Sequence, residues 1–141
     1  MLRKSLLLFV LSCFQTSTNN ALTVPVTQLT TKAKSQLSAV ELQDFLSRPA
    51  NWPTIVASSD RVESETADVN APFMPGNSVQ EYFGLGLLNV DWICRVNRPG
   101  TLVFESPDGV PGIASDCSMT FEIRDKEVEL TMGYNPNSPI A

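Results

Sequence analysis

The sequence of 141 residues contains no histidine. Histidine is the commonest acid–base catalyst near neutral pH and a frequent zinc ligand, so its absence removes the usual candidates for both roles. No nucleophile motif, phosphate-binding glycine loop or metal-ligand pattern takes its place. Gly84-Leu85-Gly86 is too short for a phosphate loop and predicts a turn. These absences favour binding over catalysis without deciding against an enzyme, and the sequence predicts no cofactor and no metal.

Acidic residues are missing from the first 40 positions, which carry the bases Arg3, Lys4, Lys32 and Lys34. From Glu41 onward all 15 acids face the remaining six of the ten bases, a net charge of −9. An acidic body repels a phosphate backbone, so we expect no nucleic-acid partner.

Long hydrophobic runs are also missing. The run Leu6–Leu11 follows a basic start at Arg3 and Lys4, and it is too short to span a bilayer. This pattern predicts a signal peptide or other targeting segment over residues 1–21, cut between Cys13 and Ala21, and a protein of the secretory pathway or a secreted protein. We expect no stable transmembrane span in the mature chain. Val10–Cys13 also resembles a bacterial lipoprotein box, although its leucine before the serine fits poorly.

A second targeting interpretation concerns Phe14–Leu37, which is rich in Ser and Thr and free of acids. It resembles the transit region that follows a signal peptide in algae with secondary plastids, which would place the protein in the plastid. The alternative is that Val24–Lys34 is simply the first strand and its flank.

Three cysteines occur, and Cys13 would leave with the targeting segment. Cys94 and Cys117 lie in apolar strand patterns, where a thiol usually behaves as a small buried hydrophobe. We expect buried free thiols. Whether they form a disulfide stays an open question, because the bond requires their strands to be neighbours.

One helix is predicted, over Ser38–Ser47. Ser38 and Glu41 have the spacing of a capping box, and Pro49 stops the helix. Its expected apolar stripe consists of Val40, Leu42, Phe45 and Leu46. The corner Asn51-Trp52-Pro53 that follows is expected to pack Trp52 onto a sheet and start a turn.

Strands dominate the rest of the chain. Alternating apolar residues predict an antiparallel sheet of six or seven strands with one dry face and one wet face, on which Asp91 and Glu122 point outward. The predicted strands are an edge-type strand at Thr23–Thr31, a short strand at Val62, and Ser78–Phe83, Val90–Val96, Thr101–Glu105, Asp116–Ile123 and Val128–Tyr134. A helix of about ten residues is only about 15 Å long, so a ligand, partner or further element must complete the dry face.

The order of these pieces resembles the START-like (SRPBCC) superfamily, which includes polyketide cyclase/dehydrase-type domains, coenzyme Q-binding START proteins and the major birch pollen allergen type. The resemblance covers about residues 22–141, which we interpret as one START-like domain. It is carried by the segments Asn51-Trp52-Pro53, Pro75–Val79, Val90-Asp91-Trp92, Pro99–Ser106, Met119-Thr120-Phe121 and Val128–Met132.

The resemblance implies an α+β helix-grip fold, in which an antiparallel sheet wraps a long C-terminal helix around an apolar cavity. The last predicted strand ends near Tyr134, and residues 135–141 read as the approach to that helix. We therefore expect the C-terminal helix to be missing from this chain and the domain to be incomplete at its C-terminus.

The implied function is the binding or transport of a lipid or other small hydrophobic ligand. By strand alternation, the cavity-lining candidates are Trp92, Phe104, Met119, Phe121, Leu130, Met132 and Tyr134. The alternative for each is that it only fills the core. Two other functions stay open: a protein-interaction module, and a polyketide cyclase/dehydratase-type enzyme. The enzyme would have to draw its acid or base from Glu81, Tyr82, Asp91 or Asp116.

Overall fold

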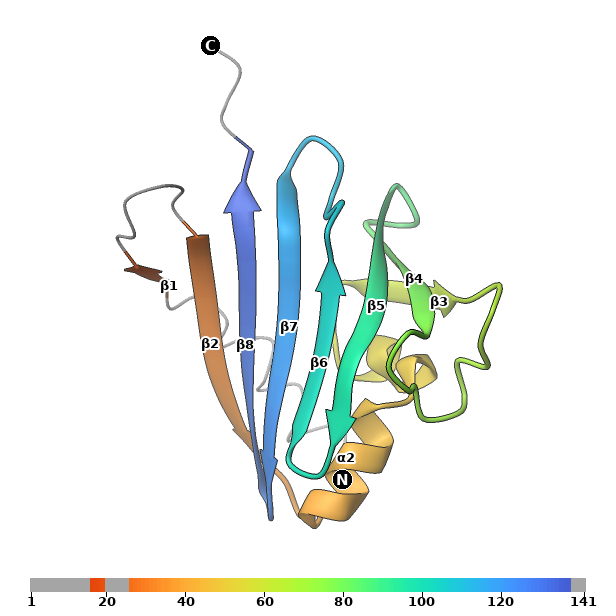
Figure 1. The fold of residues 1–141 in the computed structure, drawn as a ribbon, viewed down its shortest axis with the longest axis vertical. Helices are drawn as coiled ribbons and strands as arrows, with labels where there is room; N and C mark the ends of the chain where they lie inside the picture. The colour runs from red at the N-terminus through yellow and green to blue at the C-terminus, as the bar shows by residue number, and fades with distance from the viewer. Residues whose placement is uncertain (1–15, 20–25, 138–141) are drawn as a thin grey trace.

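The computed structural model describes residues 16–19 and 26–137 (Figure 1). Its eight strands form one antiparallel sheet in the order β1-β2-β8-β7-β6-β5-β4-β3. The strands are β1 (Thr16–Asn19), β2 (Val26–Lys34), β3 (Ser59–Glu63), β4 (Ser78–Phe83), β5 (Leu88–Arg98), β6 (Thr101–Ser106), β7 (Ala114–Arg124) and β8 (Glu127–Pro136). This α+β architecture is the predicted fold class.

Two helical segments lie between β2 and β3, and Figure 1 shows them together against one face of the sheet. They are α2 (Ala39–Leu46) and the 3₁₀ helix η1 (Pro49–Thr54). The chain passes through them from β2 to the far edge at β3, then returns through consecutive hairpins until β8 pairs with β2. The two segments therefore come before the central strands of the sheet in the sequence and lie over one face of it.

The predicted capping box of α2 is confirmed. Ser38 Oγ accepts a hydrogen bond from the Glu41 backbone N–H at 3.3 Å, and Glu41 Oε2 accepts one from the Ser38 backbone N–H at 2.9 Å. The predicted apolar stripe is wrong at Val40, whose exposed fraction is 79% while Leu42 is buried. Two residues turn a helix by about 200°, so Val40 and Leu42 lie on opposite sides of α2.

Trp52 packs onto the sheet, as predicted. Its ring meets Phe104 of β6 edge-on, with centroids 4.9 Å apart, and its indole Nε1–H donates to the Leu46 carbonyl at 3.0 Å. The expected turn is instead the 3₁₀ helix η1, which the two prolines Pro49 and Pro53 favour by fixing φ. This anchored tryptophan fixes the height of η1 above the sheet.

The strand predictions agree closely with the structure from β4 onward, and β4 has the predicted bounds. Asp91 and Glu122 are exposed, as alternation required. The prediction of an edge strand is wrong at the start of β2, where Thr27–Leu29 pairs with β1 as well as with β8. Residues 23–25 of that predicted strand lie outside the described residues.

Both described cysteines are free thiols; Cys94 is buried and Cys117 is half-buried. Burial raises the pKa of Cys94 to about 11 and also raises the pKa of Cys117. Cys13 lies outside the described residues.

Two predictions concern the chain ends. The apolar run of the predicted signal peptide lies outside the described residues. The predicted absence of a C-terminal helix also concerns residues outside them, because the described part ends at Asn137 just after β8. Within residues 16–19 and 26–137, no helix is long and apolar enough to cross a membrane.

Candidate functional site

An apolar cavity of about 230 Å³ lies between η1 and the inner face of the sheet. Its floor is formed by β4, β5, β7 and β8, and its roof by η1 and the residues just after it. The lining residues are Trp52, Ile55, Val56, Ser58, Glu81, Phe83, Trp92, Met119, Phe121, Leu130 and Met132. Val56, Phe83 and Met132 are half-buried, so the cavity meets solvent beside them.

The structure brings five of the seven predicted residues together around this cavity: Trp92, Met119, Phe121, Leu130 and Met132. The sheet register explains the grouping, since Met119 is opposite Met132 and Phe121 is opposite Leu130. Directly paired residues in an antiparallel sheet place their side chains on the same face. Two pairs thus make one continuous apolar floor.

The other two predicted residues do not line the cavity. Phe104 is completely buried, and its ring contacts Trp52 and Phe73, with the Phe73 centroid 6.4 Å away. It therefore supports the roof from below. Tyr134 lies beyond Met132 toward the end of β8 and is half-buried.

Sequence reasoning did not place Glu81 in the cavity. The signal was available in β4, because alternation puts Glu81 on the same face as Val79 and Phe83, and Val79 is buried. The roof residues Ile55, Val56 and Ser58 were missed for a different reason. They follow the 3₁₀ helix η1 in irregular structure, where no repeating pattern assigns residues to a face.

Glu81 is the only acidic or basic side chain that is buried in the described part of the chain, with an exposed fraction of 4%. Its Oε2 accepts a hydrogen bond from Trp92 Nε1–H at 2.8 Å. Burial raises the pKa of Glu81, and this outweighs hydrogen bonding from Ser59 and Trp92, which favours the charged form. None of the four described ion pairs includes Glu81, so its charge is offset only by hydrogen bonding and not by a base.

Ser59 is the second polar group at this corner. It is buried, with an exposed fraction of 6%, and follows the lining residue Ser58. Its hydroxyl is near enough to favour the charged form of Glu81, yet Oγ makes no hydrogen bond of ordinary geometry. A buried hydroxyl with unused capacity beside a carboxyl is uncommon in native interiors.

The chemistry offered by the cavity is therefore narrow. Its walls are mainly aromatic and aliphatic, and the polar lining residues are Ser58 and Glu81. Glu81, with the buried Ser59 hydroxyl beside it just behind the lining, forms the polar corner. In the described ranges, no group of three His, Cys, Asp or Glu residues could hold a metal ion. The arrangement suits an apolar molecule with a single hydrogen-bonding group.

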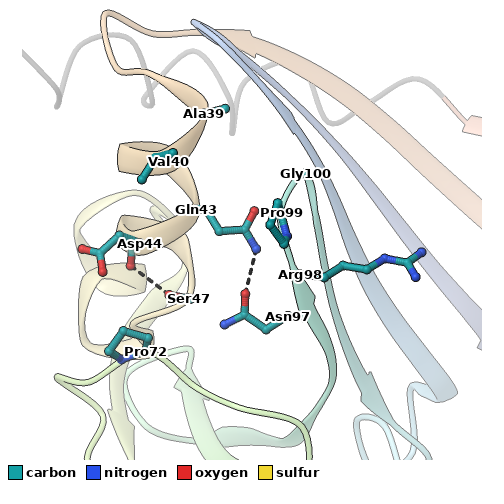
Figure 2. Close-up of a pocket in the computed structure, with 10 residues that line it drawn as sticks. All are labelled: Ala39, Val40, Gln43, Asp44, Ser47, Pro72, Asn97, Arg98, Pro99 and Gly100. Carbon is teal, nitrogen blue, oxygen red and sulfur yellow. Dashed lines mark hydrogen bonds between the residues drawn. The ribbon is translucent and has the colours of Figure 1, made fainter.

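A second hollow lies between α2 and the β5–β6 turn (Figure 2). Figure 2 shows Gln43 and Asn97 facing each other, and Gln43 Nε2 donates to Asn97 Oδ1 at 2.7 Å. Gln43 Nε2 also reaches the Thr101 carbonyl at 3.3 Å, and Asn97 Nδ2 donates to the Phe73 carbonyl at 2.7 Å. These bonds join α2 to the sheet. The polar residues of this hollow therefore have a structural role, and no ligand is needed to explain them.

Comparison with solved structures finds the same fold in proteins of very low sequence identity. The chain is similar to a START superfamily protein from Mycobacterium smegmatis, with a TM-score of 0.62 and 6% identity, covering 81% of this chain and 80% of that one. It is also similar to the Zhui aromatase/cyclase from Streptomyces sp. R1128, with a TM-score of 0.61 and 12% identity, covering 82% and 71%. For Ara h 8.0201 the TM-score is 0.57 and the identity 11%, covering 82% and 83%.

The chain has a START-like (SRPBCC) fold, as its sequence resemblance indicated. No protein-family model matches the chain, and no curated protein matches it either.

Proposed function

We propose that the protein binds a small, mostly apolar ligand in the cavity between η1 and the sheet. The observation that carries the proposal is the cavity itself, whose walls are almost entirely apolar although strands from distant parts of the chain build it. Protein interiors are normally close-packed, with few voids larger than a water molecule. A volume of about 230 Å³ would hold roughly eight waters at about 30 Å³ each. Apolar walls give such waters few partners, so an apolar ligand displaces them favourably.

The size of the cavity limits the ligand. Ligand pockets usually range from about 300 to 1,000 Å³, so this one suits a small molecule or one end of a longer lipid chain. The flexible side chains Met119 and Met132 lie opposite each other on its floor and can adjust to ligands of different shape. The START-like fold supports this proposal.

The first experiment is a fluorescence titration of the purified full chain with Nile red, an uncharged apolar dye. Met132→Trp should fill the cavity from its exposed side and weaken dye binding by at least about tenfold, the loss of about 1.4 kcal/mol of contact. Thr131→Trp is the matched control, because the neighbouring residue on β8 faces away from the cavity. Equal dye binding by both variants would contradict the proposed site. Native mass spectrometry of the same preparation would identify any co-purifying ligand.

A second function, cyclase or dehydratase chemistry, is favoured only by Glu81, which places one carboxyl group of raised pKa at the cavity wall. The test is turnover of an aromatic polyketide, with Glu81→Gln compared with Glu122→Gln on the outer face. Turnover that persists in Glu81→Gln would rule out this role for Glu81.

A further inference from the structure

The polar corner of the cavity contains more hydrogen-bonding capacity than the protein uses. Trp92 engages only one carboxyl oxygen of Glu81, Oε2, which leaves Oε1 to accept a further bond. The Ser59 hydroxyl lies near enough to Glu81 to favour its charged form, but it makes no hydrogen bond of the usual distance and angle. Both side chains are more than nine-tenths buried, so bulk water does not supply the missing hydrogen bond of either.

We propose that this corner, formed by Glu81, Ser59 and Trp92, binds the hydroxyl group of an uncharged, otherwise apolar ligand and excludes ligands that end in a carboxylate. The inference rests on the proposed function and adds the head-group chemistry to it.

A hydroxyl is the group that matches both free positions. It has one O–H donor and two acceptor lone pairs, so it can donate to the Glu81 carboxylate and accept from the Ser59 hydroxyl at the same time. An ammonium group offers donors only and leaves the Ser59 donor unmatched. A carboxylate offers acceptors only, and it would bring a second negative charge against Glu81.

The repulsion is strong because no base in the described part of the chain forms an ion pair with Glu81. Arg61 of β3 instead pairs with Glu63 at 3.0 Å and covers the ring of Tyr82, 4.0 Å from its centroid. Tyr82 alternates with Glu81 along β4 and so faces the other side of the sheet. Like charges placed together without water cost several kcal/mol.

The experiment compares three ligands that share one alkyl chain: decanol, decanoate and decylammonium. Each displaces Nile red from the full-length protein at neutral pH, and the readout is the affinity ratio of decanol to decanoate. The wild-type ratio should be at least about tenfold. Because any apolar pocket disfavours a charged ligand to some degree, the decisive quantity is the change in this ratio on mutation.

Glu81→Gln removes the charge and keeps an acceptor for Trp92, so the ratio should fall to about threefold or less. Glu122→Gln, an exposed change on the outer face of β7, should leave it as in the wild type. Ser59→Ala should weaken decanol by about threefold to tenfold and leave decanoate unchanged. This variant decides the question if Glu81→Gln does not fold.

The outcomes separate the two proposals. Dye binding at the cavity with an unchanged ratio in Glu81→Gln, or with no effect of Ser59→Ala on decanol, overturns the hydroxyl assignment and leaves the proposed function standing. Tighter binding of decylammonium than of decanol also overturns it. If the dye and all three ligands fail to bind, the proposed function itself is wrong.

Discussion

The hydrogen bond between Trp92 and Glu81 gives a prediction whose size depends on pH. Trp92→Phe keeps an aromatic ring in the sheet but removes the indole N–H that lies 2.8 Å from Glu81 Oε2. A hydrogen bond to a charged group contributes about 1.5–3 kcal/mol, and one between neutral groups about 1 kcal/mol. The loss should therefore be larger where Glu81 is ionised.

The direction with pH follows from the raised pKa of Glu81. A carboxyl group whose pKa is higher in the folded state contributes stability at low pH, and this contribution is lost as pH rises above the ordinary value of 4.5 through the folded value. The Trp92 bond favours the charged form, so its removal raises the folded pKa further and deepens that loss. Trp92→Phe should cost more at about pH 8 than at about pH 4.

Urea unfolding followed by far-UV circular dichroism measures this difference, because the signal does not depend on the tryptophan removed. The small packing loss from Trp to Phe is the same at both pH values and cancels in the comparison. In a Glu81→Gln background the same substitution should cost equally at both. An equal cost at both pH values in the wild-type background would refute the assigned contact.

Three further predictions follow from other contacts. Phe104→Ala should destabilise the protein by about 3–5 kcal/mol in urea unfolding, because the fully buried ring supports Trp52; a loss below about 1 kcal/mol would show that the roof repacks freely. Ser38→Ala should lower the free energy of unfolding by about 1 kcal/mol and Ser38→Asp by much less, since Asp keeps an acceptor for the cap of α2. Equal losses in the two variants would contradict the capping box. With a pKa of about 11, Cys94 should resist iodoacetamide at about pH 8 in the folded protein and react after unfolding, as followed by peptide mass spectrometry; labelling of Cys94 in the folded protein at its unfolded rate would contradict its burial.

Strand alternation explains why so much of the sheet was predictable. In β7 and β8 the apolar residues recur every second position, and the facing pairs Met119–Met132 and Phe121–Leu130 follow from that period and the hairpin between them. The helix α2 was equally clear, because its cap signal is local.

Other features depend on contacts that no local pattern shows. Phe104 has the same alternation as Met119, yet its ring packs against Trp52 of η1 and does not line the cavity. The indole of Trp52 also donates to the Leu46 carbonyl at the end of α2, a side-chain contact that the apolar pattern does not reveal. For Glu81, alternation along β4 indicates the inward face, but its contact with Trp92 depends on the pairing of β4 with β5, which no local pattern shows.

A two-dimensional ¹H–¹⁵N NMR spectrum, recorded while decanol is added to the ¹⁵N-labelled full chain, tests the cavity as the ligand site most directly. The Trp92 indole N–H lies at the polar corner, whereas the amide side chains of Gln43 and Asn97 line the separate hollow beside α2. Binding in the cavity predicts a saturable shift of the Trp92 indole signal with little change at Gln43 and Asn97. Shifts confined to Gln43 and Asn97, or no saturable shift at Trp92, would contradict it.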